Sequence, residues 1–267
     1  MTLALITGAS GGIGRAFAEY HAAKGGNLII AARRADALEA LRDELEARHG
    51  VSVTPVACDL GTPEGLATLI VATEGRDIGI LINNAGFGGR GEFLSRPLTD
   101  DLAMIDLNIG AVVTLCHAIA PSMVSRGGGR ILNVGSSAGM MPGPLQATYF
   151  ASKAFIDSFS QALDEELRGQ GVTVTLLAPG YVETDFAERA DMHGIPLTKS
   201  GRSAKATAKV GYDAMMAGRL HVVSEAGLSL AANWILPLMP RRVVLKVVRR
   251  MQTRQDGAAL ASRGRNR

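Results

Sequence analysis

The chain has 267 residues, of which 47% are hydrophobic, 4% aromatic and 20% charged, with 32 glycines and two cysteines. This apolar content excludes intrinsic disorder of the main body, and the two cysteines exclude a disulfide scaffold. Charge is uneven: residues 241–267 hold nine bases and one acid, whereas residues 1–240 hold 19 bases and 24 acids. The basic balance therefore belongs to the end of the chain, and the body offers no general surface for nucleic acid.

Short apolar runs alternate with segments of helical spacing along the chain. The predicted strands are Leu3–Thr7, Leu28–Ala32, Val51–Ala57, Ile78–Ile82, Arg130–Val134, Val172–Leu177 and, less clearly patterned, His221–Ser224. The predicted helices are Ile13–Lys24, Ala35–Arg48, Glu64–Thr73, Asp100–Ser125 and Thr148–Arg168. This alternation predicts an α/β fold, a Rossmann-like doubly wound parallel sheet with helices on both faces.

The same pattern divides the chain into a body and an extension. Residues 1–225 are predicted to form one dinucleotide-binding and catalytic domain, residues 226–253 a helical extension, and residues 254–267 a disordered basic tail. Residues 184–219 interrupt the alternation with a long polar segment, and we expect them to form a lid. No base precedes the first apolar run, which is not typical of a signal peptide, so a cytoplasmic protein is expected.

A glycine-rich turn, Thr7-Gly8-Ala9-Ser10-Gly11-Gly12-Ile13-Gly14, joins the first predicted strand to the first helix. Glycine allows the backbone of a sharp turn and lets a pyrophosphate approach the helix N-terminus, where free N–H groups favour an anion. The turn therefore indicates a dinucleotide site, although its glycine spacing alone is a weak signal.

The second predicted strand ends in Arg33 and Arg34, where an acidic residue would bind the ribose 2′-hydroxyl of NAD. A guanidinium instead suits a 2′-phosphate, through charge-assisted and forked hydrogen bonds. The two arginines therefore favour NADP over NAD.

Further motifs follow later strands. Asn83-Asn84-Ala85-Gly86 follows the fourth, Ser136 follows the fifth, Tyr149-x-x-x-Lys153 opens the next helix, and Pro179-Gly180 follows the sixth. In order and spacing, about residues 1–225 resemble the short-chain dehydrogenase/reductase family. In one respect the chain departs from the family pattern, because Gly11 stands where many NADP-preferring relatives carry a base.

The resemblance implies a catalytic set of Ser136, Tyr149 and Lys153, with Asn108 completing a proton relay. It also implies that Asp59 contacts the adenine and that Thr184 lies near the nicotinamide amide. The predicted cofactor-binding residues are Gly8, Ser10, Gly12, Ile13, Gly14, Arg33, Arg34, Asp59, Asn84, Ala85, Gly86, Tyr149, Lys153, Pro179, Gly180, Val182 and Thr184.

The chemistry of these residue types agrees with a carbonyl–alcohol reaction. Tyr149 and Lys153 are four residues apart and share one helix face, so a nearby ammonium is expected to lower the pKa of the phenol from about 10. The five histidines are scattered and the cysteines lack metal-ligand spacing, so no metal site is predicted.

The substrate side is predicted to be moderately apolar, from side chains in the lid and beside Ser136: Phe186, Met192, Ile195, Leu197, Met140, Met141 and Leu145. In the extension, Val244, Val247, Val248 and Met251 share one helical face, and bases favour the other side. This helix could dock on the body or a partner subunit, or lie on a membrane surface as a weak contact. Contact with nucleic acid is not expected, because no aromatic residues are interleaved with the bases.

These observations predict an NADP-preferring oxidoreductase that interconverts a small-molecule carbonyl and its alcohol, with Tyr149 as general acid and base, working as a homodimer or homotetramer. The alternative is a non-catalytic NAD(P)-binding redox sensor or scaffold built on the same fold. An intact Ser136–Tyr149–Lys153 set argues against the alternative, since a sensor need not keep proton-transfer residues.

Overall fold

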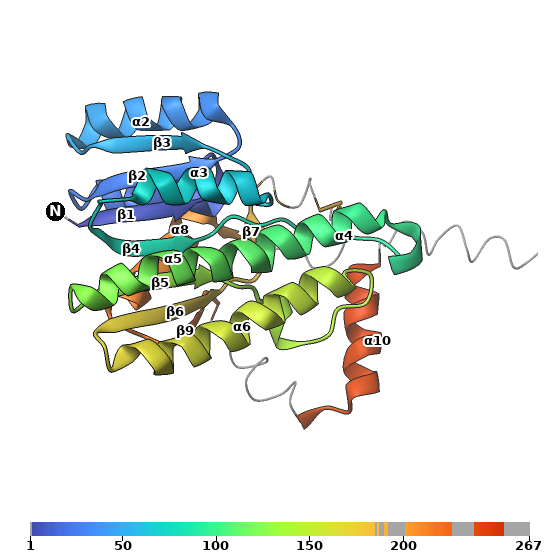
Figure 1. The fold of residues 1–267 in the computed structure, drawn as a ribbon. Helices are drawn as coiled ribbons and strands as arrows, with labels where there is room; N and C mark the ends of the chain where they lie inside the picture. The colour runs from blue at the N-terminus through green and yellow to red at the C-terminus, as the bar shows by residue number, and fades with distance from the viewer. Residues whose placement is uncertain (1, 185, 187–189, 192–200, 226–237, 254–267) are drawn as a thin grey trace, which may run out of the picture.

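The computed structural model describes residues 2–184, 186, 190–191, 201–225 and 238–253. Its centre is a parallel sheet of seven strands in the order β3-β2-β1-β4-β5-β6-β9 (Figure 1). These strands are β1 (Leu3–Thr7), β2 (Asn27–Ala32), β3 (Val53–Ala57), β4 (Ile78–Asn83), β5 (Gly129–Val134), β6 (Val172–Ala178) and β9 (His221–Val223). The order reverses between β1 and β4, which confirms the predicted doubly wound fold and places a crevice at the carboxyl ends of these strands.

Helices cover both faces of the sheet. One face carries α1 (Gly12–Ala22), α2 (Ala35–His49) and α8 (Ala204–Met216), and the other carries α3 (Pro63–Thr73), α5 (Ala111–Ser125) and α6 (Ala147–Arg168). Shorter elements lie near the carboxyl edge: η1 (Phe93–Ser95), α4 (Leu98–Ile105), η2 (Asp106–Gly110), η3 (Ser137–Met140), and the two-stranded pair β7 (Val182–Glu183) and β8 (Arg202–Ser203).

Alternation along the strands builds two cores. Leu5 pairs with Ile29 and Leu81 and faces the α3–α5–α6 side, whereas the next residue, Ile6, faces the α1–α2–α8 side with Ile30. All five side chains are fully buried. Burial on both faces explains why the strands are runs of apolar residues rather than alternating ones.

The structure differs from the expected lid in its second half. Residues 204–216 form α8, which packs beside α1 on the sheet and buries Ala208, Tyr212 and Met215. A helix N-cap, Ser203 accepting from the Ala206 N–H at 3.2 Å, begins this element. Most of residues 184–200, including the predicted lid residues Met192, Ile195 and Leu197, lie outside the described part of the chain.

The C-terminal extension contains α10 (Arg241–Gln252), which crosses the carboxyl end of the sheet near the start of α6 (Figure 1). Val244 and Val248 are buried on the body, one of the placements left open by the sequence, but Val247 and Met251 are exposed and Gln252 is buried instead. The contact face is therefore rotated from the expected apolar stripe by about one residue position, toward the side chains at i, i+4 and i+8.

Among the described residues, the helical stretch Leu98–Ser125 is long and apolar enough to cross a membrane by length and composition alone, with a mean hydropathy of 1.8. Its α5 part, however, buries Leu115, Cys116, Ile119 and Met123 against the sheet. That packing is typical of the core helix of an α/β domain.

Candidate active site

A cavity of about 1010 Å³ runs along the carboxyl ends of the central strands, from the turn after β1 to α10. Of the residues predicted to bind cofactor or act in catalysis, all line this cavity except Gly14 and Asn108. The structure thus brings segments from across the sequence into one site, and the two exceptions lie directly behind its wall.

Steric contacts and backbone angles explain why glycine occupies each of the three predicted positions of the turn. Gly8 and Gly12 have φ values of +69° and +55°, a region that disfavours residues with a Cβ. A Cβ on Gly14 would overlap the Gly8 carbonyl oxygen, and one on Gly8 would lie 2.7 Å from Asn84 Nδ2. This close backbone packing leaves an open, backbone-lined cradle at the start of α1, which suits a pyrophosphate.

Thr7 ties the turn to the strand beside it. Its Oγ1 accepts from the backbone N–H groups of Asn84 and Ala85, at 2.9 and 3.0 Å. Asn84 Nδ2 donates back to the Thr7 carbonyl at 2.9 Å. These bonds position the segment after β4 against the turn after β1, so that the two together form one wall of the cavity.

Two arginines and one carboxylate mark the far end of the cavity. Arg34 Nη2 donates to the Ser10 carbonyl at 2.9 Å, which holds this guanidinium against the glycine turn. Arg33 is largely exposed, and its Nη1 lies 3.9 Å from Asp59 Oδ2. Both guanidinium groups therefore face the place where an adenosine ribose would lie if a pyrophosphate occupied the turn.

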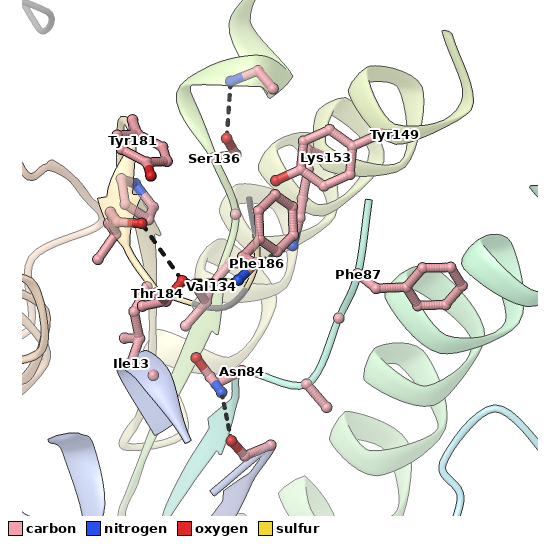
Figure 2. A pocket seen from close by; sticks show the side chains of 18 of the residues that line it. Ile13, Asn84, Phe87, Val134, Ser136, Tyr149, Lys153, Tyr181, Thr184 and Phe186 are labelled. Carbon is pink, nitrogen blue, oxygen red and sulfur yellow. Dashed lines mark hydrogen bonds between the residues drawn. The ribbon is translucent and has the colours of Figure 1, made fainter. Parts of the chain in front are cut away.

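At the opposite end, Ser136, Tyr149 and Lys153 come together from β5 and α6 (Figure 2). Lys153 Nζ donates to the Val134 carbonyl at 2.9 Å and lies 5.9 Å from the centre of the Tyr149 ring. Ser136 Oγ accepts from the Ala138 N–H at 3.1 Å, which fixes the hydroxyl at the end of β5. A phenol, a hydroxyl and an ammonium thus meet where a carbonyl oxygen could be bound and protonated.

Burial shifts the pKa values of both Tyr149 and Lys153. It raises the pKa of Tyr149 to about 12, an effect that a hydrogen bond from Ser136 partly opposes. It also lowers the pKa of Lys153 to about 8. The expected net lowering of the Tyr149 pKa is therefore not found in this structure, because desolvation of the buried phenol raises that pKa.

Asn108 lies in η2, a π-helical turn between α4 and α5, a feature that is frequent at functional sites. Its side chain donates to the Phe87 carbonyl at 2.9 Å and to Ser152 Oγ at 3.1 Å, and accepts from the Phe87 N–H. A Cβ on Gly86 would lie 2.9 Å from Asn108 Oδ1 and 3.6 Å from Lys153 Nζ. Glycine at this position therefore lets the backbone pass between Asn108 and Lys153.

The segment after β6 closes the site near the glycine turn. Pro179, Gly180, Val182 and Thr184 line the cavity, and a Cβ on Gly12 would meet Thr184 Cγ2 at 3.2 Å. The Gly180 N–H donates to Glu225 Oε2 at 3.0 Å. Glu225 was not predicted as a site residue, and no motif in its neighbourhood indicates it.

The substrate end is mainly apolar. The Phe186 ring lies 5.5 Å from the Tyr149 ring, and Met141, Val248 and Met251 complete the wall. Of the other residues predicted for this side, Met140 and Leu145 do not line the cavity. The apolar contact surface therefore comes from three separate parts of the chain, α10 included.

Sequence reasoning missed a pair of amides in this wall. Gln146 Nε2 donates to Gln252 Oε1 at 2.5 Å, and both side chains are buried. Arg90 Nε also donates to the Gln252 carbonyl, at 2.8 Å. The helical spacing of Val244, Val248 and Gln252 could have placed Gln252 on the buried face. A glutamine, however, is not expected on the buried face of a helix.

The fold and this constellation define a dinucleotide-binding α/β protein with a tyrosine–lysine pair beside the nucleotide crevice. A family profile described as short chain dehydrogenase matches residues 2–193. The human very-long-chain 3-oxoacyl-CoA reductase is 35% identical over 189 residues, which cover 69% of this chain and 61% of that protein. The match thus spans less than two thirds of the human relative's length.

A second relative, the sulfoacetaldehyde reductase of Chromohalobacter salexigens, is 40% identical over 185 residues, 68% of this chain and 72% of that protein. Among solved structures, a short-chain dehydrogenase from Sphingobium yanoikuyae in complex with NADPH has a TM-score of 0.80 and 31% identity, covering 90% of this chain and 97% of that one. The chain belongs to the short-chain dehydrogenase/reductase family.

Proposed function

We propose that this chain is an NADP-dependent oxidoreductase that interconverts a moderately apolar carbonyl compound and its alcohol. The observation that carries the proposal is the cavity itself, which joins a glycine cradle at one end to Ser136, Tyr149 and Lys153 at the other. When bound there, a reduced nicotinamide would supply the hydride that such a reduction needs.

The residues at the cradle fit a phosphorylated dinucleotide. The turn is bare of side chains where a pyrophosphate would approach, and the free N–H groups at the start of α1 favour an anion. Arg33 and Arg34 support a 2′-phosphate, since they follow β2 directly, at the positions where the acid that NAD requires would stand. The Sphingobium relative solved with NADPH supports the same choice.

At the catalytic end, we assign proton transfer to Tyr149. With a pKa of about 12 the phenol is neutral at pH 7 and can donate its proton to a carbonyl oxygen that gains negative charge. Ser136 is placed to hydrogen-bond that oxygen from the end of β5. The Lys153 ammonium stabilises the tyrosinate left behind, and Asn108 orients the backbone of Phe87 beside it.

The test is turnover with NADPH or NADH across a panel of aliphatic, aromatic and acyl carbonyl substrates. Tyr149→Phe keeps the ring but removes the proton donor, so kcat should fall by about 10²–10⁴-fold while NADPH still binds. Tyr20→Phe, on α1 and hydrogen-bonded to Asp213 rather than to the site, serves as the control and should keep wild-type turnover.

Near-wild-type turnover of Tyr149→Phe would assign the acid to another residue. Tight NADPH binding with no turnover across the panel would instead support the redox-sensor alternative. A cytoplasmic location and assembly as a homodimer or homotetramer stay predictions, which light scattering and fractionation of cells would test.

A further inference from the structure

The helix α10 presents three different faces. Val244, Val248 and Gln252 are buried on the body. A second row, Val243, Val247 and Met251, is spaced at i, i+4 and i+8 and remains 43%, 47% and 40% exposed. Leu238, just before the helix, is 85% exposed. An apolar row that stays this exposed on a charged helix is unusual for a solvated surface.

The third face is basic. Arg242, Lys246 and Arg250 are exposed, and residues 238–253 contain five bases and no acid. One of these bases, Arg249, pairs with Glu92 at 2.6 Å. Positive charge is therefore concentrated beside the exposed apolar row and is not neutralised within the segment itself.

We propose that α10 docks the protein on an anionic lipid surface, with Val243, Val247 and Leu238 entering the headgroup layer and the bases contacting lipid phosphates. An amphipathic helix with a basic flank and a shallow apolar row is suited to this interface. Each Lys or Arg near an anionic surface adds roughly five-fold to binding.

The positive charge of the basic face of α10 favours an anionic lipid surface over a second copy of the chain as the binding partner. A symmetric interface would bring the same basic face of two protomers together, and like charges would repel. Nucleic acid would satisfy the bases but would leave the apolar row in water. An anionic lipid surface would bury the apolar row and bind the basic residues at the same time.

The docking also has a geometric consequence for the cavity. Met251 ends the exposed row and lines the cavity wall, beside Val248 and Gln252. A lipid surface held against α10 would therefore lie next to the apolar end of the cavity.

The experiment is co-sedimentation of the full chain with vesicles of phosphatidylcholine alone or with 30% phosphatidylglycerol added, at about 0.1 M and 0.5 M salt. The wild type should bind the anionic vesicles only, and less at high salt. Lys246→Glu with Arg250→Glu should weaken binding by at least about thirty-fold. Val243→Ser with Val247→Ser should weaken it by at least about five-fold.

A matched control is the double charge reversal Lys24→Glu with Arg48→Glu, at exposed positions on α1's C-terminal side and α2. It should keep vesicle binding, and all variants should keep wild-type melting temperature and turnover of a soluble substrate. The proposal is overturned if the wild type does not bind anionic vesicles, or if the α10 variants and the control bind alike. A change in oligomeric state in Val243→Ser/Val247→Ser without vesicle binding would assign the row to a second copy and also overturn it.

Discussion

The lowered pKa of Lys153 can be measured through stability, independently of any substrate. Burial lowers this pKa from the 10.5 of a free lysine to about 8, so the folded protein binds the proton less tightly than the unfolded chain does. Holding the ammonium then costs about 3 kcal/mol of unfolding free energy at pH 7 and about 2 kcal/mol at pH 9. Lys153→Met lacks the ammonium. Relative to this variant, the unfolding free energy of the wild type should thus rise by about 1 kcal/mol between these two pH values.

Urea unfolding of both proteins at pH 7 and pH 9 measures this change, because other titrating groups cancel in the difference. Lys205→Met, which removes an exposed lysine of α8, is the matched control. A wild type–Lys153→Met difference that moves by less than about 0.3 kcal/mol would refute the reasoning. In turnover, reduction should slow as the pH rises through about 8, since the ammonium beside Tyr149 is lost.

Three further outcomes are expected. Arg33→Asp should lower kcat/KM with NADPH by about ten- to a hundred-fold and favour NADH, and equal effects on both cofactors would contradict the 2′-phosphate assignment. Gly14→Ala should weaken NADPH binding by at least about ten-fold, because its Cβ would overlap the Gly8 carbonyl oxygen, whereas Gly110→Ala, whose Cβ meets nothing within 4 Å, should not. Removing residues 255–267 should leave melting temperature and turnover intact, while truncation before Arg241 should lower melting by at least about 5 °C in thermal scans, because it deletes the buried face of α10.

The parts of the fold that local chemistry controls were predictable from the sequence. Strands β1, β2 and β4 were found because they are buried on both faces and so are nearly continuous apolar runs. The glycine turn was found because positive φ values and close backbone packing leave few other residues possible. Tyr149 and Lys153 were paired correctly because four residues make one helical turn.

Features of the fold and the site that depend on contacts between distant segments were not predictable from the sequence. Residues 204–216 look polar and interrupted by glycine, yet they form α8, because Gly211 packs against Leu177 and Phe17 where a side chain would not fit. The direction of the Tyr149 pKa was predicted wrongly, because four-residue spacing shows proximity to Lys153 but not the desolvation that both groups share.

Helix α10 and the catalytic end share one buried cluster of side chains. Val244 and Val248 of α10 share a buried apolar cluster with Tyr149 and Phe150 of α6. The burial that raises the pKa of Tyr149 therefore takes place beside α10, and movement of the helix would admit water to the phenol. Since α10 also carries the exposed apolar row and the bases, contact with a surface and the environment of the proposed acid are linked through one helix of twelve residues. A shift of α10 should then alter both the pKa of Tyr149 and the shape of the substrate end, because Val248, Met251 and Gln252 of this helix line the cavity.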